Sequence, residues 1–215
     1  DPRHVMHRRL FLVSAASAAG LAGCGMPESG PDATPDAVSR AAYRFDGPPA
    51  ITLFTMVSNE NGDGAHTSMM INASQRVVFD PAGSVSHPRM IERGDVIYGM
   101  TPELAELYEG AHARETYHVV IQRREVPPEV AEEALRLVME NGTVAQAFCT
   151  QANSRILRQL PGFETIRPTF YPSSLSRQFG ALPGVTTRTR YETDSDDKSR
   201  AVDAYFDESG EGASG

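Results

Sequence analysis

Runs rich in β-branched and aromatic residues, bounded by turn residues, recur along the middle of the chain. Such runs are typical of strands. They predict strands at residues 51–57, 65–71, 76–80, 96–98 and 116–121. The segment Asn72-Ala73-Ser74-Gln75 joins the second strand to the third, so these two form a predicted β-hairpin. Glu92-Arg93-Gly94-Asp95, before the fourth strand, is expected to be a solvated turn.

Helix-start signals follow the predicted hairpin. Thr101-Pro102-Glu103 places a threonine N-cap before a proline in the first turn, and Pro127-Pro128-Glu129 opens a second helix that runs to about residue 140. A third helix is predicted from about residue 145 to 159, because apolar residues recur there every four positions. This expected buried stripe consists of Val144, Phe148, Ala152, Ile156 and Leu160. With a short helix near Ser174, the elements predict an α+β fold, a small antiparallel sheet packed against helices.

The N-terminal segment has the pattern of an export signal. Arg8 and Arg9 precede an apolar stretch at residues 10–21, which is too short to span a bilayer as a mature helix. The stretch ends in Leu21-Ala22-Gly23-Cys24, which resembles the lipobox recognised by the bacterial lipoprotein signal peptidase. The resemblance implies a signal peptide at residues 1–23 and a lipid on Cys24 that anchors the protein to a membrane, facing the periplasm of a bacterial cell envelope. The alternative is a short buried helix.

Composition divides the remaining chain into three parts. Residues 24–45, rich in Pro, Gly, Ser, Asp and Ala, are expected to form a flexible tether after the lipidated cysteine. Residues 46–190 suit one domain with its own core, and residues 191–215 form an acidic tail expected to be disordered. Loss of residues 1–23 would remove three basic residues and one acidic residue, so the net charge would fall from −8 to −10. Such an acidic chain is a poor candidate for binding nucleic acid.

The cysteine count singles out one side chain. The chain has two cysteines, Cys24 and Cys149. If Cys24 carries a lipid, Cys149 has no disulfide partner, which is unusual for a thiol in an oxidising compartment. The alternative to a chemical role is an inert buried cysteine that packs as a small hydrophobic residue.

Three residues are the candidates for a thiol active site: Cys149 in the first turns of a predicted helix, His66 on a strand and Asp80 at the end of the next strand. The positive end of a helix dipole stabilises a thiolate, and such environments lower a cysteine pKa to between roughly 3.5 and 7.5. A histidine opposite the thiol can accept its proton, and a third polar group can orient the imidazole.

The hairpin loop decides whether Asp80 can reach His66. A two-residue loop at Ala73-Ser74 would direct Asp80 to the opposite face of the sheet, whereas a three-residue loop or a bulge would bring both side chains to one face. Asp80 before Pro81 is alternatively a turn former. Two other histidines compete as the base: His87 in a loop that is expected to be exposed, and His118 within a strand.

Three segments together resemble the circularly permuted papain-like proteins of the NlpC type, in which the histidine strand precedes the cysteine helix. They are Gly64-Ala65-His66-Thr67-Ser68, Val77-Val78-Phe79-Asp80-Pro81-Ala82-Gly83 and Ala147-Phe148-Cys149-Thr150. The resemblance covers residues 48–185. It implies a papain-like sheet-on-helix fold, a nucleophile at Cys149, a base at His66 and an orienting residue at Asp80. Members of this group cleave peptide or isopeptide bonds or transfer acyl groups, and the third residue varies among them.

The sequence carries no signature of other common sites. No two His or Cys residues lie at metal-ligand spacing, Gly62-Asp63-Gly64 is too short for a phosphate loop, and no Gly-x-Ser-x-Gly motif is present. We therefore expect a thiol hydrolase, free of metal and cofactor, that cleaves an amide or peptide bond, with cell-wall peptide as a substrate within reach of the tether. Two further hypotheses stay open: a lipid acyltransferase or thioesterase, and a non-catalytic envelope lipoprotein that uses the same fold for binding or assembly.

Overall fold

The computed structural model describes residues 31–83 and 85–211. Within them, seven strands form a single sheet in the order β4-β5-β3-β2-β1-β6-β7, and every neighbouring pair is antiparallel. The strands are β1 (Ala50–Ser58), β2 (Gly64–Asn72), β3 (Arg76–Phe79), β4 (Glu92–Arg93), β5 (Val96–Ile97), β6 (Tyr117–Glu125) and β7 (Val185–Arg190).

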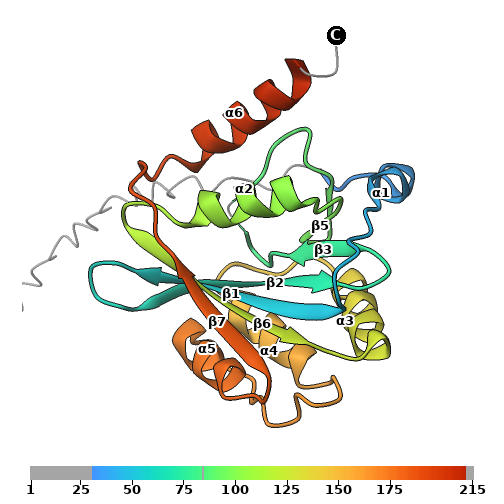
Figure 1. Cartoon of the computed structure of the whole chain (residues 1–215), viewed down its shortest axis with the longest axis vertical. Helices are drawn as coiled ribbons and strands as arrows, with labels where there is room; N and C mark the ends of the chain where they lie inside the picture. Colours follow the sequence, from blue (N-terminus) through green and yellow to red (C-terminus); the bar gives the residue numbers. More distant parts are fainter. Residues whose placement is uncertain (1–30, 84, 212–215) are drawn as a thin grey trace, which may run out of the picture.

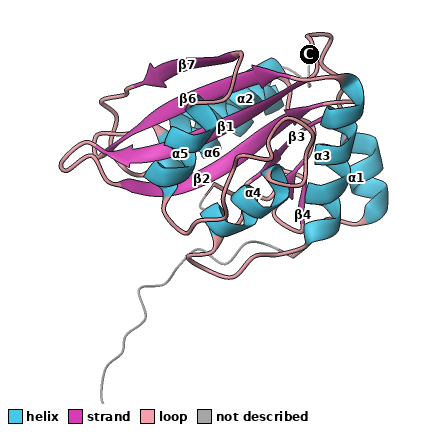
Figure 2. Ribbon diagram, turned by 90° about the horizontal axis from the view of Figure 1, so that it is seen from below, coloured by secondary structure: helices cyan, strands magenta, loops and turns pink. Residues whose placement is uncertain are grey.

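Six helices in the described residues cover both faces of this sheet. They are α1 (Pro35–Ala41), α2 (Pro102–His112), α3 (Pro128–Asn141), α4 (Cys149–Leu157), α5 (Pro172–Gly180) and α6 (Lys198–Glu211). Figure 1 shows α2 and α6 above the sheet and α3, α4 and α5 below it, and Figure 2 shows the lower layer from beneath. The predicted α+β class, an antiparallel sheet packed against helices, is confirmed.

Alternate strand residues enter two hydrophobic cores, one on each side of the sheet. On β1, Leu53 faces the core built with α3, α4 and α5, and Phe54 faces the core built with α2. We call these two sides the α4 face and the α2 face. Burial on both sides explains why β1 has a nearly continuous apolar sequence rather than an alternating one.

The β2–β3 hairpin has a three-residue loop. Asn72 pairs with Arg76 and Met69 with Phe79, so Ala73, Ser74 and Gln75 form the turn. By this register, the backbone after β3 continues with Asp80 on the same side of the sheet as Ser68 and His66. The register that would separate Asp80 from His66 does not occur.

Several predicted features are wrong in detail. The stripe residue Phe148 is 43% exposed, because α4 begins only at Cys149 and Ala147 before it has a left-handed φ of 67°. The turn before β5 is not simply solvated: Asp95, with a φ of 61°, is buried. Gly94 and Asp95 link β4 to β5 with positive φ at both positions, the geometry that a tight hairpin turn needs.

Both ends of the predicted domain are also more ordered than expected. Within the predicted tether, residues 31–45 include α1, and Gly94 donates a hydrogen bond to Asp32 (2.8 Å). The tail, expected to be disordered from residue 191, forms α6, which buries Val202 against the α2-face core. β7 was not predicted as a strand. The predicted signal peptide, Cys24 and residues 212–215 lie outside the described residues.

Candidate active site

The hairpin brings His66 and Asp80 into direct contact. The His66 Nε2 lies 2.6 Å from Asp80 Oδ1, and the Asp80 side chain is 2% exposed. Gly83 is required where the chain turns beneath this carboxylate, since a Cβ at that position would collide with the Asp80 carboxyl group. With Nε2 committed to Asp80, the other ring nitrogen, Nδ1, is the one available to a substrate or nucleophile.

Cys149 is the first residue of α4, which is held on β2 by buried polar contacts. Asn153 Nδ2 donates to the Thr67 backbone carbonyl (2.8 Å), and the Thr67 and Thr150 hydroxyls lie 3.1 Å apart. Asn153 and Thr150 are fully buried. These contacts fix the start of α4 beside the first half of β2, the half that carries His66.

Cys149 and His66 approach from different sides of the sheet and meet at an open strand edge. His66 lies on the α2 face, whereas α4 packs on the other face against Thr67. β3 pairs with β2 only from Met69 to Asn72, so among the described residues the start of β2 has no strand on that side. There the Thr67 backbone N–H and the His66 imidazole both act on the Cys149 sulfur and favour its thiolate form, and the Thr150 hydroxyl lies 3.7 Å from the sulfur.

The surroundings favour a charged thiolate–imidazolium pair. Burial opposes ionisation of the thiol, but the hydrogen bond and the charge of His66 outweigh burial and lower the Cys149 pKa from 9.0 to about 7. Burial also disfavours the imidazolium, but the charge and hydrogen bond of Asp80 raise the His66 pKa from 6.5 to about 9. Between these two values both groups are charged. The thiol pKa lies at the upper end of the range expected from the sequence, because burial offsets part of the lowering.

A polar wall beneath His66 was not found by the sequence analysis. The His112 ring stacks at 6.2 Å from the His66 ring, and the Tyr108 hydroxyl donates to Ser68 Oγ (2.7 Å). Burial, followed by the positive charge of Lys198, lowers the His112 pKa to about 3, so this imidazole is neutral at physiological pH. The available signal was the spacing of Tyr108 and His112, four residues apart on one face of a predicted helix.

Asp95 connects the two loops that carry Asp80 and Cys149. Its backbone carbonyl accepts from the Asp80 N–H (2.8 Å), and its Oδ2 accepts from Ala82 N (3.1 Å) and Val144 N (2.8 Å). One buried carboxylate therefore ties the turn after β3 to the segment that leads into α4. We regard Asp95 as a positioning residue for the site.

An exposed aromatic cluster borders the nucleophile. Phe148 directly precedes Cys149, and its ring meets Phe170 edge-on at 5.4 Å. Phe170 is 50% exposed and Tyr171 is 74% exposed. Gly64 allows α5 to bring these residues close to β2, since a Cβ there would lie 2.7 Å from the Ser173 backbone nitrogen.

The two histidines that compete with His66 as the base, His87 and His118, lie away from the thiol. His118 Nδ1 pairs with Asn59 Oδ1 (2.7 Å), and the His118 ring stacks on Tyr191. His87, which we expected to be exposed, is half-buried and stacks on Phe206 of α6 at 4.2 Å. Neither is placed to act as the base for Cys149.

No group of three or more His, Cys, Asp or Glu side chains in the described part of the chain is arranged to hold a metal ion. In the same residues, no helix has the length and apolarity needed to cross a membrane. Comparisons with protein-family models, with curated proteins and with solved structures found no match.

Proposed function

We propose that this protein is a thiol hydrolase of the circularly permuted papain-like class that cleaves an amide or peptide bond. The observation that carries the proposal is the continuous chain from the Cys149 thiol, with its pKa lowered to about 7, through His66 to the buried Asp80. A merely structural cysteine would not need a helix start, an imidazole and a buried carboxylate arranged in sequence.

In this mechanism the Cys149 thiolate attacks the carbonyl carbon and forms a tetrahedral oxyanion. No side chain of the described residues caps the start of α4, so its first backbone N–H groups can donate to that oxyanion. The His66 imidazolium then protonates the leaving amine as the C–N bond breaks, which leaves a thioester on Cys149. His66, now neutral, removes a proton from water, the resulting hydroxide attacks the thioester, and the acid product leaves with the thiol restored. Asp80 holds the imidazole in place through both steps.

The cellular setting is part of the proposal and rests on Leu21-Ala22-Gly23-Cys24. A lipid on Cys24 would hold the domain at a membrane of the bacterial envelope, on the periplasmic side. Peptide bonds of the cell wall are then the substrate nearest to the active site.

The aromatic cluster favours a second candidate, transfer or hydrolysis of a lipid acyl group. Exposed Phe148, Phe170 and Tyr171 can receive an apolar chain beside the nucleophile. The same thiolate would attack an ester or thioester carbonyl, so the two candidates differ only in the substrate that the aromatic rings accept.

The test uses the full chain with Cys24→Ser, so that Cys149 is its one thiol, and a Cys149→Ser control. Peptide amide substrates and long-chain acyl thioesters are supplied in parallel, and the covalent acyl-enzyme is detected by mass spectrometry. A peptide-derived adduct on Cys149 supports the hydrolase, and a fatty-acyl adduct supports the lipid candidate. If neither adduct forms and an electrophile such as iodoacetamide labels Cys149 only after unfolding, the protein is a binding module.

A further inference from the structure

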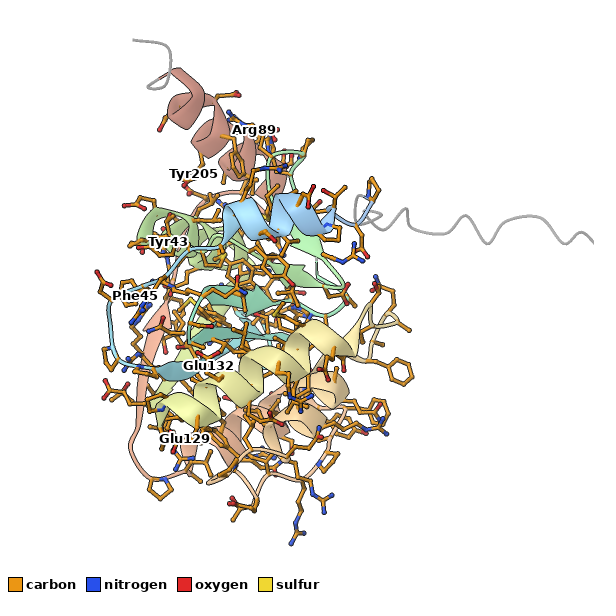
Figure 3. The ribbon with its side chains drawn as sticks, turned by 90° about the vertical axis from the view of Figure 1, so that its right-hand side faces the viewer. Tyr43, Phe45, Arg89, Glu129, Glu132 and Tyr205 are labelled. Carbon is orange, nitrogen blue, oxygen red and sulfur yellow. The ribbon has the colours of Figure 1, made fainter. Side chains whose placement is uncertain are left out.

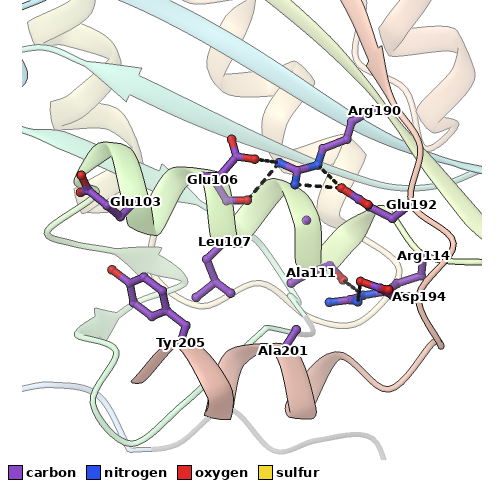
Figure 4. Close-up of a pocket in the computed structure, with 11 residues that line it drawn as sticks. Glu103, Glu106, Leu107, Ala111, Arg114, Arg190, Glu192, Asp194, Ala201 and Tyr205 are labelled. Carbon is purple, nitrogen blue, oxygen red and sulfur yellow. Dashed lines mark hydrogen bonds and ion pairs between the residues drawn. The ribbon is translucent and has the colours of Figure 1, made fainter. Parts of the chain in front are cut away.

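The cavities on the α2 face differ in whether their charged groups are satisfied. Figure 4 shows one between α2, β7 and α6, in which Arg190 pairs with Glu106 (2.6 Å) and Glu192 (2.9 Å). Arg114 in the same cavity contacts Asp194 (3.4 Å). Arg190 and Arg114 each already pair with a carboxylate, so neither cation in this cavity requires an anionic ligand.

A smaller cavity of about 180 Å³ lies farther along the α2 face, at the ends of β1 and β2. Its walls include apolar side chains, Phe45 and Met70, and polar ones, Thr52, Asn72, Arg76 and Arg123. Figure 3 shows Phe45 and Tyr43 on the segment that runs from α1 towards β1. Asn72 lies six positions after His66 on β2, or roughly 20 Å along an extended strand, so this cavity is distinct from the candidate active site.

Arg76 is a buried cation in this cavity without an ion-pair partner among the described residues. The residue is 6% exposed; its Nε donates to Met70 Sδ (3.2 Å), and its guanidinium lies over the Phe45 ring at 4.5 Å. Tyr43, Glu109 and Glu103, in that order, influence Arg76 electrostatically, but neither carboxylate forms an ion pair with it in the described residues, and both Glu109 oxygens already accept from Arg188 at 2.7 Å. A buried charge without a close opposite charge is costly, and an anionic ligand would remove that cost.

Asn72 supplies a second unsatisfied group beside Arg76. The two residues are directly paired across the β2–β3 hairpin. Asn72 Nδ2 donates to the carbonyls of Gly47 (3.0 Å) and Pro48 (2.9 Å), which fixes the amide orientation. Its Oδ1 is buried and has no hydrogen-bond partner in the described structure. The cavity is therefore lined by a cation and, next to it, by an amide whose buried acceptor lacks an N–H donor.

The cavity adjoins a second cavity that lies over the neighbouring strands. This second cavity, of about 250 Å³, shares Thr52, Met70 and Arg123 with the first and extends to Thr186 and Thr187 on β7. The combined groove crosses β2, β1, β6 and β7, roughly 14 Å at about 4.8 Å between neighbouring strands, which is long enough for more than a single amino acid.

We propose that this groove binds the C-terminal end of a peptide: Arg76 pairs with the terminal carboxylate, Asn72 Oδ1 accepts the N–H of the same residue, and the preceding residues lie towards β7. A carboxylate and an amide N–H one carbon apart match the adjacent cation and acceptor. Phosphate or acetate would satisfy Arg76 but not Asn72. The site is independent of the chemistry at Cys149.

The test is a titration of the full chain with N-acetyl-Ala-Ala, with the same dipeptide as its C-terminal amide, and with acetate. The free dipeptide should shift the side-chain resonances of Arg76 Nε–H and Asn72 in the wild-type protein. The amide and acetate should each bind about 10- to 100-fold more weakly. The amide loses the charge-assisted contact with Arg76, and acetate loses the hydrogen bond to Asn72 Oδ1. Equal binding of all three probes, or shifts that avoid Arg76 and Asn72, would overturn the proposal.

Variants add an independent check. Arg76→Met should remove the preference for the free carboxylate, and Asn72→Ala should weaken the dipeptide while leaving acetate unchanged. Arg124→Met is the matched control, because Arg124 lies next to Arg123 on β6 but points to the other face, over Phe163. Cys149→Ser should bind like the wild type, so a failed hydrolase assay would not affect this result. If Arg76→Met fails to fold, the resonance shifts in the wild-type protein and the comparison of the three probes still test whether the groove binds a peptide C-terminus.

Discussion

Replacement of His66 by alanine should return the pKa of the Cys149 thiol from about 7 to near its ordinary value of 9.0. In the intact site the pKa falls from 9.0 to about 7, and the hydrogen bond and charge of His66 are the largest causes of that lowering. Burial acts in the opposite direction and remains in the variant, as do the smaller lowering effects of Thr67 and Thr150. The pKa of the variant thiol should therefore be about 9, a change in ionisation free energy of about 2.7 kcal/mol.

The effect on reactivity is smaller than the effect on the pKa. At pH 7 the thiolate fraction would fall from about half to about 1%, roughly a 50-fold loss. A thiolate of higher pKa is intrinsically more nucleophilic, with a Brønsted coefficient of about 0.4–0.5, which restores about six- to tenfold. The alkylation rate at pH 7 should then fall about five- to eightfold. The midpoint of the alkylation rate against pH is therefore a more sensitive measure of the change than the rate at pH 7.

The assay measures iodoacetamide alkylation of Cys149 against pH by mass spectrometry, in the full chain with Cys24→Ser. His118→Ala is the matched control, because His118 is also a strand histidine but contacts Asn59 and Tyr191 rather than the thiol. A wild-type midpoint near 9, or a midpoint near 7 that persists in His66→Ala, would refute the proposed ion pair and leave Cys149 as a packing residue.

Four further outcomes are expected. Hydrolysis should follow a bell-shaped pH profile, rising through about pH 7 as the thiol ionises and falling through about pH 9 as the imidazolium loses its proton. Asp80→Asn should move the alkaline limb of this profile to lower pH, because Asp80 raises the His66 pKa. An alkaline limb that does not move would exclude that role of Asp80. Gly83→Ala should lower both the melting temperature and the activity, since the new Cβ collides with the Asp80 carboxyl group, whereas the same change at Gly62, where a Cβ meets open space, should lower only the stability through its positive φ. Asn153→Ala should destabilise the fold by about 1–3 kcal/mol in denaturant unfolding, because the Thr67 carbonyl loses a buried donor; a loss below about 0.5 kcal/mol would mean that this contact does not hold α4. Cys24→Ala should release the protein from the membrane fraction or leave it unprocessed, and unchanged processing and retention would reject the lipid anchor.

Local pattern was sufficient to predict much of the fold. The predicted strand at residues 51–57 corresponds to β1 (Ala50–Ser58), and the helix opened by Thr101-Pro102 corresponds to α2 (Pro102–His112), with the Thr101 hydroxyl accepting from Leu104 N (3.2 Å). These elements are specified by neighbouring residues, through capping and side-chain period. Residue type and expected element likewise indicate the three candidate site residues in the sequence.

Contacts between distant segments decided the remaining features. β7 has the sequence VTTRTR, largely exposed, and exists because its backbone pairs with β6 at the edge of the sheet. In α6, burial of Val202 against the α2-face core supports a segment whose composition alone suggested disorder. Neither burial nor cross-strand pairing can be read from residues that are close together in the sequence.

The sequence by itself determined which side chains could do chemistry: one thiol at a helix start, one histidine on a strand and one carboxylate after the next strand. Only the tertiary structure decided that they meet. The three-residue turn sets Asp80 on the side of His66, and the early end of β3 leaves an edge of β2 open where Cys149 can reach the imidazole from the other face. A shift of one residue in that register would have turned Asp80 away, because successive strand residues point to opposite faces.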